Sequence, residues 1–245
     1  MDIIDHTLFG GSNFWWFEGK RQFIVSLIEK FGRGNPQRIL DAGCGTGDLL
    51  RPLKHSGKLC GFDNNFESLK IAKSETGELT CSSIDNIGLK SNSFDFVIVT
   101  DVLEHTKNDV QSLKEIARVT KPSGHILISV PAFSFLYSSH DIALQHYRRY
   151  DCPDLLRMIK ACSLEIKYKT YWNFSVFPVL FFIRLLKKLF NHKQKLKKVL
   201  FPEWSNKLLN KIISLENRLI AAGFVPPFGL SIYLVLEKRS ENEKT

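Results

Sequence analysis

The pattern of apolar and polar positions divides the chain into short strand-like segments that alternate with longer stretches of helical spacing. Apolar residues three or four positions apart predict helices, as in Phe23 to Ile28 and Val110 to Val119. Strands that alternate with helices indicate an α/β fold, and the near-continuous apolar run from Asp95 to Thr100 is typical of a central parallel strand covered on both faces. The other strand-like segments are Arg38 to Leu40, Lys58 to Phe62, Glu78 to Ser82, His125 to Val130, Ser163 to Trp172 and Leu230 to Glu237.

The first strand leads into a glycine-rich turn. Asp41 comes first, and Gly43, Gly45 and Gly47 follow at alternate positions. Glycine tolerates positive φ angles and leaves no Cβ between the backbone and a ligand, and the N–H groups of such a turn favour a polar ligand. A second acid, Asp63, ends the next strand, where open α/β folds place a ribose-binding carboxylate. No Gly-Lys-Ser or Gly-Lys-Thr follows, so the turn is not a P-loop.

Four segments in register resemble the class I S-adenosylmethionine (AdoMet) methyltransferases. The glycine turn is similar to motif I of that family, and three further matches follow in the family's order: Ser93–Val99, Asp101–His105 and Lys121–Pro131. The resemblance covers residues 36–131 and is weaker outside them. The aromatic and basic N-terminal segment is similar to that of a bacterial subgroup with a type 11/12 methyltransferase domain, which is associated with small molecules, glycans and lipids.

The resemblance implies one doubly wound, Rossmann-like α/β domain. Its seven-stranded sheet would have the order 3-2-1-4-5-7-6 with the last strand antiparallel, and residues 48–55 would form the first helix, with Pro52 tolerated near its start. The predicted segments are an N-terminal cap helix (1–35), an AdoMet-binding core (36–131), an acceptor-side segment (132–172), a helical insertion between strands six and seven (173–225), and the last strand with its tail (226–245).

The family motifs place the cofactor at the carboxyl edge of the first four strands. Asp41 would orient the amino group of AdoMet, and Asp63 would hold both ribose hydroxyls, although either acid could instead cap a turn or a helix. Ser83 departs from the aspartate that many relatives carry there, which leaves more of the adenine contact to the Ile84 backbone. The other cofactor-binding positions implied by the resemblance are Gly43, Cys44, Gly45, Asn64, Thr100 and Leu103.

The turn after the fourth strand carries polar residues that would face the methyl acceptor. Glu104 is predicted to bind the acceptor, and His105 is a candidate general base because imidazole titrates near neutral pH. In a second interpretation, Asp101, Glu104 and His105 hold a divalent ion, a pattern that resembles some quinone O-methyltransferases. In a third, Glu104 and His105 only cap and solvate the next helix. We expect no bound metal.

A second polar cluster follows the fifth strand, where this superfamily usually builds its acceptor site. His140 and His146 are further candidates for the general base, and an arginine of this cluster is suited to bind phosphate bidentately. Alternatively, the cluster is a structural loop in which Asp151 caps the next helix. The predicted acceptor-binding residues are Asp141, Tyr147, Arg148 and Arg149.

The insertion joins an apolar aromatic block to a basic run. Residues 173–183 are apolar but too few to span a bilayer, which needs about 20 residues. Seven lysines and arginines follow between Arg184 and Lys198, with no acid before Glu203. This combination is typical of peripheral contact with an anionic membrane. Nucleic-acid binding is the rival use of the charge, which the phenylalanines disfavour, and a buried cap helix with a solvated basic face is the third interpretation.

Composition and charge indicate the compartment in which we expect the protein. The chain of 245 residues is 44% hydrophobic, which suits one α/β domain, and its net charge of +9 is concentrated in the insertion. Five cysteines without C-x-x-C spacing indicate buried thiols in a reducing compartment. The N-terminus shows no signal-peptide pattern. We therefore expect a cytoplasmic protein, with membrane association, if any, on the cytoplasmic face.

These features together predict AdoMet-dependent methyl transfer, with an oxygen of a hydrophobic or lipid-linked small molecule, such as a glycan or a quinone, as the acceptor. Because the sulfonium methyl is already activated, the protein mainly has to align donor and acceptor. The alternative is a non-catalytic protein that binds AdoMet or S-adenosylhomocysteine in a regulatory or membrane-docking role.

Overall fold

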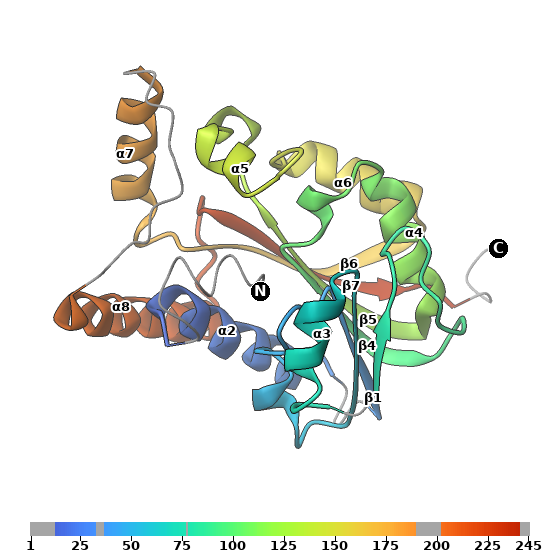
Figure 1. Ribbon diagram of the computed structural model, residues 1–245. Helices are drawn as coiled ribbons and strands as arrows, with labels where there is room; N and C mark the ends of the chain where they lie inside the picture. The colour runs from blue at the N-terminus through green and yellow to red at the C-terminus, as the bar shows by residue number, and fades with distance from the viewer. Residues whose placement is uncertain (1–12, 33–36, 77, 190–201, 241–245) are drawn as a thin grey trace.

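Seven strands form one sheet in the order β3-β2-β1-β4-β5-β7-β6 (Figure 1). The computed structural model of the chain describes residues 13–32, 37–76, 78–189 and 202–240. The pairs from β3 to β5 are parallel, and β7 is antiparallel to both β5 and β6, which confirms the predicted topology. The strands are β1 (Arg38–Ala42), β2 (Lys58–Asp63), β3 (Glu78–Cys81), β4 (Phe94–Thr100), β5 (Thr120–Pro131), β6 (Leu164–Trp172) and β7 (Ser231–Lys238).

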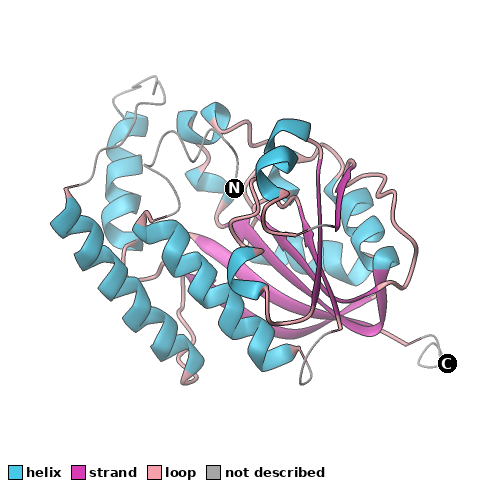
Figure 2. Ribbon diagram, turned by 60° about the horizontal axis from the view of Figure 1, so that its bottom comes forward, coloured by secondary structure: helices cyan, strands magenta, loops and turns pink. Residues whose placement is uncertain are grey.

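Helices cover both faces of the sheet (Figure 2). Successive residues of β1 point to opposite faces, so Leu40 joins one buried cluster, with residues of α4 and α6, and Ile39 joins the other, with residues of α2 and α8. The helices are α2 (Trp15–Phe31), α3 (Phe66–Ala72), α4 (Asp109–Val119), α5 (Ser139–Ala143), α6 (Cys152–Ala161), α7 (Phe177–Leu189) and α8 (Glu203–Ala221), and the 3-10 turns are η1 (Arg51–Leu53), η2 (Leu103–His105) and η3 (Ser134–Leu136).

The prediction of a helix over residues 48–55 is wrong. The chain there makes turns, and only η1 has helical hydrogen bonding. Pro52 has no N–H to donate to a carbonyl one helical turn earlier, and the segment between Gly47 and Gly57 is too short to continue past it. The glycine turn is therefore followed by a compact loop instead of a regular helix.

The expectation that all five cysteines are buried is also wrong. Cys44 and Cys60 are buried, Cys152 and Cys162 are partly exposed, and Cys81 is exposed. Cys81 ends β3, which is an edge strand of the sheet, so that part of the chain is covered less completely than β1 or β4.

The N-terminal helix and the last helix of the insertion pack against each other. A Cβ on Gly19 of α2 would lie 2.3 Å from the Ile213 side chain of α8, so the two helices meet where α2 has no side chain. Asn217 of α8 donates to the Gly19 carbonyl at 2.9 Å and accepts from the Trp172 indole at 2.8 Å. These contacts confirm the predicted helical insertion and attach it to the end of β6.

Among the described residues, no helix is both long enough and apolar enough to cross a membrane. The insertion contributes α7 and α8 instead, and residues 190–201, which include the predicted basic positions Lys193, Lys195, Lys197 and Lys198, lie outside the described residues. The same is true of residues 1–12 at the N-terminus.

Candidate functional site

The glycine turn after β1 brings its backbone close to the loop after β4. Gly43, Gly45 and Gly47 have φ angles of +78°, +51° and +82°, which most other residues avoid. A Cβ on Gly43 would lie 2.6 Å from the Val102 Cγ2 atom, so a larger residue there would displace one loop from the other. The Phe62 carbonyl accepts from the N–H groups of Gly43 and Cys44 at 2.8 and 2.9 Å, which ties the turn to β2.

Asp63 is buried at the end of β2, directly beside this turn. Its carboxylate oxygens accept from the N–H groups of Gly45 and Asn65, both at 2.8 Å. A carboxylate oxygen has a second lone pair, so both oxygens can still accept a ligand hydroxyl. Among the described residues, the buried Thr46 hydroxyl of the turn has no hydrogen-bond partner. The turn therefore offers acceptors and an unused hydroxyl to a polar ligand.

Asp41 lies buried at the end of β1, close to the ammonium group of Lys20 on α2. The pKa of Asp41 is raised to about 6, chiefly by burial; the Lys20 ammonium group opposes this shift and the Asp63 carboxylate adds to it. A cationic ligand group beside Asp41 would favour its ionised form. Asp41 is thus suited to bind an amino group, as the sequence predicted, and its titration makes that role testable.

We expect the affinity for AdoMet to fall in acid because of Asp41. Below its pKa of about 6 the carboxyl is neutral, so a ligand ammonium group has to displace a proton, which costs about tenfold in affinity per pH unit. Calorimetry from about pH 5 to pH 7.5 measures this slope. Asp41→Asn should bind weakly with little pH dependence, and an unchanged dissociation constant for the wild type would contradict the assignment.

The other predicted cofactor positions surround the same edge with different exposure. Asn64 and Ser83 are exposed, Thr100 is partly exposed, and Ile84 is buried beside them. Leu103 is completely buried in the core, which favours a packing role over a direct cofactor contact.

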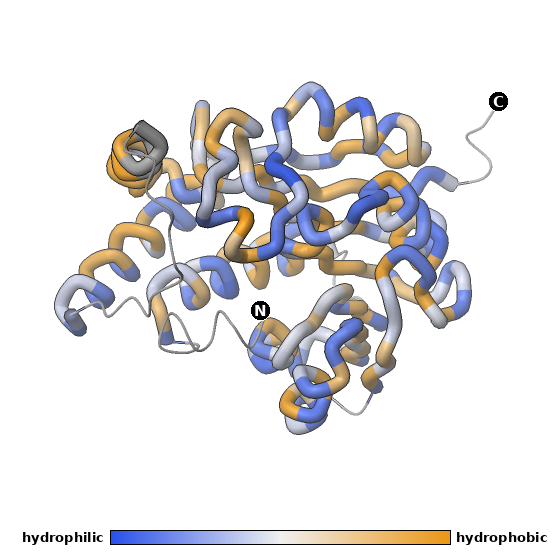
Figure 3. Tube along the Cα trace, turned by 45° about the horizontal axis from the view of Figure 1, so that its top comes forward, coloured by the Kyte–Doolittle hydropathy of each residue, from blue (hydrophilic) through white to orange (hydrophobic). Residues whose placement is uncertain are grey.

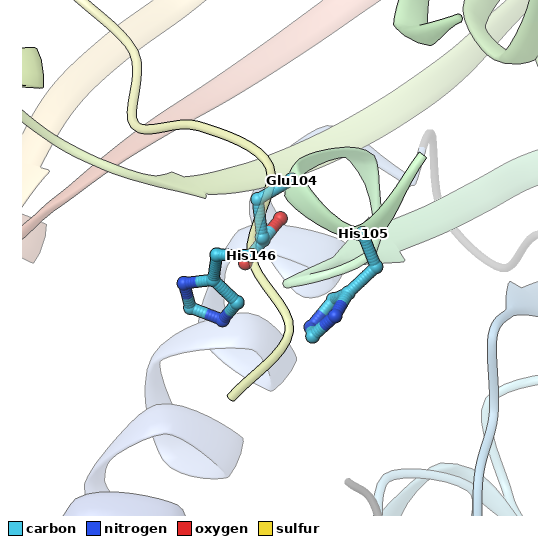
Figure 4. A group of neighbouring side chains, drawn as sticks. All are labelled: Glu104, His105 and His146. Atoms are coloured by element: carbon cyan, nitrogen blue, oxygen red, sulfur yellow. The ribbon is translucent and has the colours of Figure 1, made fainter. Parts of the chain in front are cut away.

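A second group of side chains gathers across the edge, in the loops after β4 and β5. One ligand atom from each of Glu104, His105 and His146 lies within 4.8 Å of the others (Figure 4). The two imidazole rings meet edge to face with centroids 4.7 Å apart. Tyr147 donates its backbone N–H to the Glu104 carbonyl at 2.8 Å, and this bond joins the two loops. These three side chains could hold a proton or, by their spacing, one divalent cation.

Glu104 is a buried acid with an unused oxygen. Burial, and then the Asp101 carboxylate, raise the pKa of Glu104 well above its ordinary value. Its Oε2 atom has no hydrogen-bond partner in the part of the chain that the structure describes. Partial burial opposes the ionisation of Asp101, but the Lys20 ammonium group at 2.6 Å and the Ser129 hydroxyl at 2.6 Å outweigh it and lower its pKa. One acid of the site therefore favours the charged form and the other favours the neutral form.

Asp141 orients His146. Its carboxylate is completely buried and lies 3.3 Å from the Nδ1 atom of His146, so the ring can donate there and leave Nε2 to the site. The same carboxylate accepts from the Arg149 guanidinium at 2.7 Å and from the backbone and hydroxyl of Ser138. Asp141, predicted to bind the acceptor, is thus a positioning residue in this structure.

The two arginines of the acceptor cluster are held by the protein itself. Arg149 is buried between Asp141 and the Ala132 carbonyl, and burial lowers its pKa although Asp141 opposes the shift. Arg148 pairs with Asp109 at 2.9 Å and donates to two carbonyls of the loop before α4. Both arginines connect loops, which gives them structural roles in addition to any contact with an acceptor.

The remaining residues of the cluster differ in position. Tyr147 is half exposed, and His140 lies on α5, partly exposed. Asp151 occupies the position before α6, but its carboxylate accepts from Ser134 instead of capping the helix. Of the three histidines predicted as bases, the structure brings His105 and His146 together.

Lys20 and a row of aromatic rings were missed by sequence reasoning. Lys20 comes from the N-terminal helix, and only its place after the aromatic cluster at residues 14–17 hinted at a role near the pocket. Phe133, directly after β5, stacks on Tyr171 at 5.6 Å and contacts Phe177 of α7 at 5.7 Å. Phe177 in turn stacks on Phe181 at 5.7 Å. This row, Phe133, Tyr171, Phe177 and Phe181, is called the aromatic row below.

Comparison with known proteins agrees with this geometry. The family model described as a methyltransferase domain matches residues 40–128, which include the glycine turn, Asp63 and Glu104. This part of the chain is therefore a methyltransferase domain, and its sheet has the class I fold. AdoMet is the cofactor of domains of this kind, and the left-handed glycine turn, Asp63 and the unpaired Thr46 hydroxyl fit its ribose and methionine ends.

Relatives and solved structures resemble this methyltransferase over different lengths. The demethylmenaquinone methyltransferase of Thermotoga maritima is 29% identical over 132 residues, 52% of this chain and 55% of that protein. The chain spans about half the length of the first curated relatives that it matches. A putative sarcosine dimethylglycine methyltransferase from Galdieria sulphuraria has a TM-score of 0.61 at 16% identity, over 90% of this chain and 85% of that one. A SAM-dependent methyltransferase from Archaeoglobus fulgidus has a TM-score of 0.59 at 18% identity, over 96% and 98%. At these identities the structures share the fold.

Proposed function

We propose that this methyltransferase transfers the methyl group of AdoMet to a hydroxyl of a hydrophobic, lipid-linked or quinone-like acceptor. The observation that carries the proposal is the His146–Asp141 pair beside Glu104, at the edge of the sheet next to the cofactor turn. An imidazole whose Nδ1–H is held by a buried carboxylate presents Nε2 as a proton acceptor.

The chain's own residues align the reactants and manage the proton. AdoMet supplies a methyl group bonded to a positively charged sulfur, which leaves as the neutral thioether of S-adenosylhomocysteine. The acceptor oxygen forms the new C–O bond, and its proton passes to Nε2 of His146. Asp141 stabilises the resulting imidazolium, and the neutral form favoured at Glu104 allows it to donate a hydrogen bond to the acceptor.

An apolar acceptor is supported by the aromatic row. Its rings lead from Phe133, at the end of β5, to α7 on the surface. Several relatives of the chain are named demethylmenaquinone methyltransferases, and demethylmenaquinone is an apolar compound. An acceptor of this kind would lie with its hydroxyl at Glu104 and His146 and its apolar part along the rings.

A methyl-transfer screen tests the proposal. The full chain is incubated with AdoMet labelled in its methyl group and with lipid or aqueous extracts, and we expect label in an organic-phase product that resists mild alkali, as an ether does and an ester does not. Calorimetric AdoMet binding without transfer to any extract would favour the non-catalytic alternative. Activity that survives exhaustive chelation would support His146 as the general base. Activity that is lost on chelation and restored only by a divalent cation would assign the Glu104–His105–His146 group to metal binding.

A further inference from the structure

Helix α8 presents an apolar stripe to solvent. Four large side chains that are 48–70% exposed recur four, seven and four residues apart, so they lie on one face of the helix. The opposite face is buried, with Ile213 and Ile220 in the core. The exposed residues are Trp204, Leu208, Leu215 and Leu219. A surface helix normally carries polar residues at such positions, so this stripe calls for an explanation beyond the fold.

Helix α7 repeats the pattern at the same end of the molecule. Val179, Phe182, Ile183 and Leu186 are 40–63% exposed and follow the spacing of one helical face. The helix stands off the sheet in Figure 1, and its trace is strongly apolar in Figure 3. In Figures 1 and 2 both insertion helices lie on the left of the molecule, and α8 packs beside α2. We call these two sets of side chains the insertion face.

The charge around the insertion face is mostly positive. Lys207, Lys211 and Arg218 of α8 are exposed, and Glu203, which pairs with Lys207 at 2.7 Å, is the only exposed acid on that helix. The sequence of α7 contains one arginine and two lysines and no acid. An anionic lipid surface binds apolar side chains that lie among cations. The acyl region takes up the apolar side chains, and the headgroups attract the cations.

We propose that the insertion face docks this protein on an anionic lipid bilayer. Trp204 is suited to the headgroup boundary, where tryptophan is enriched because its ring is apolar and its N–H is polar. A second copy of the chain would bring cations of the same sign together, and a nucleic acid would leave the exposed leucines in water. The proposal concerns the surface alone and does not depend on the acceptor.

Vesicle sedimentation of the full chain tests this surface. We expect binding to vesicles that contain phosphatidylglycerol, little binding to pure phosphatidylcholine, and weaker binding as salt is raised. The double variant Leu208→Ser, Leu215→Ser should bind phosphatidylglycerol vesicles about tenfold or more weakly, because serine at both positions removes apolar area from the face. Its affinity for AdoMet should match the wild type, which shows that the variant is folded.

Ile71→Ser is the matched control. Ile71 is 54% exposed on α3, on the opposite side of the sheet order from the insertion, so its replacement should leave vesicle binding unchanged. Wild-type protein that stays in the supernatant with anionic vesicles at low salt would overturn the proposal. So would a double variant that binds as tightly as the wild type, or a wild-type dimer in sedimentation equilibrium that the double variant loses, since the stripe would then belong to a second copy.

Discussion

Replacing His146 with alanine should lower the turnover number about a hundredfold to ten-thousandfold. This is the range that a positioned general base contributes, and in this structure the Nδ1 atom of His146 faces the buried carboxylate of Asp141. The dissociation constant of AdoMet should not change, because His146 lies in the loop after β5 and the cofactor residues follow β1 and β2. Single-turnover rates with labelled AdoMet measure the chemical step directly.

Two further variants make the result specific. His146→Gln keeps a polar side chain but provides no strong base, so it should be nearly as slow as alanine. His55→Ala removes an exposed imidazole from the loop before β2, at the amino edge of the sheet, and should have no effect. A His146→Ala enzyme within threefold of wild-type turnover (about 0.6 kcal/mol) would remove His146 from the mechanism.

The place of the glycine turn and of the two strand-end acids could be predicted from the sequence because it depends on local geometry. Asp41 and Asp63 each end a strand, and β1 and β2 are parallel neighbours, so the register that pairs Ala42 with Phe62 brings both acids to one edge. The glycines reveal a left-handed turn without reference to any distant contact. The helix expected after the turn was a wrong prediction, since the proline at position 52 lies inside a short segment where neighbouring hydrogen bonds cannot offset it.

The acceptor side depends on contacts that no spacing reveals. His146 reaches Glu104 because the backbone of Tyr147 binds that of Glu104, across more than forty residues of chain. His146 is preferred as the base because its ring lies 3.3 Å from the buried Asp141 carboxylate and beside Glu104 and His105. Arg148 and Arg149, which the sequence predicted to bind the acceptor, form ion pairs with Asp109 and Asp141. Residue types predicted the chemistry, and the tertiary contacts assigned the individual roles.

Replacing Asp63 with alanine should raise the dissociation constant of AdoMet about a hundredfold. A hydrogen bond to a charged group contributes about 1.5–3 kcal/mol, and two ribose hydroxyls on one carboxylate therefore account for at least 3 kcal/mol, or two powers of ten. The carboxylate also accepts from the N–H groups of Gly45 and Asn65, so the alanine variant leaves two donors of the turn without their partner. Calorimetry with AdoMet and with S-adenosylhomocysteine should show the same loss, because both carry the ribose.

Separating the ligand contact from the stability of the turn requires a conservative variant and a neighbour. Asp63→Asn keeps the size of the side chain and one acceptor oxygen, so it should unfold near the wild-type temperature and still bind AdoMet at least about tenfold more weakly, which corresponds to the loss of one charged hydrogen bond. Glu67→Ala removes an exposed acid in the first turn of α3 that pairs with Lys70, and should change neither property. If Asp63→Asn binds like the wild type while Asp63→Ala is merely unstable, Asp63 supports the turn and another group holds the ribose. The Gly45 N–H donates a hydrogen bond to Asp63 at the edge where β1 and β2 end, so in that case the ribose would have to bind away from this edge.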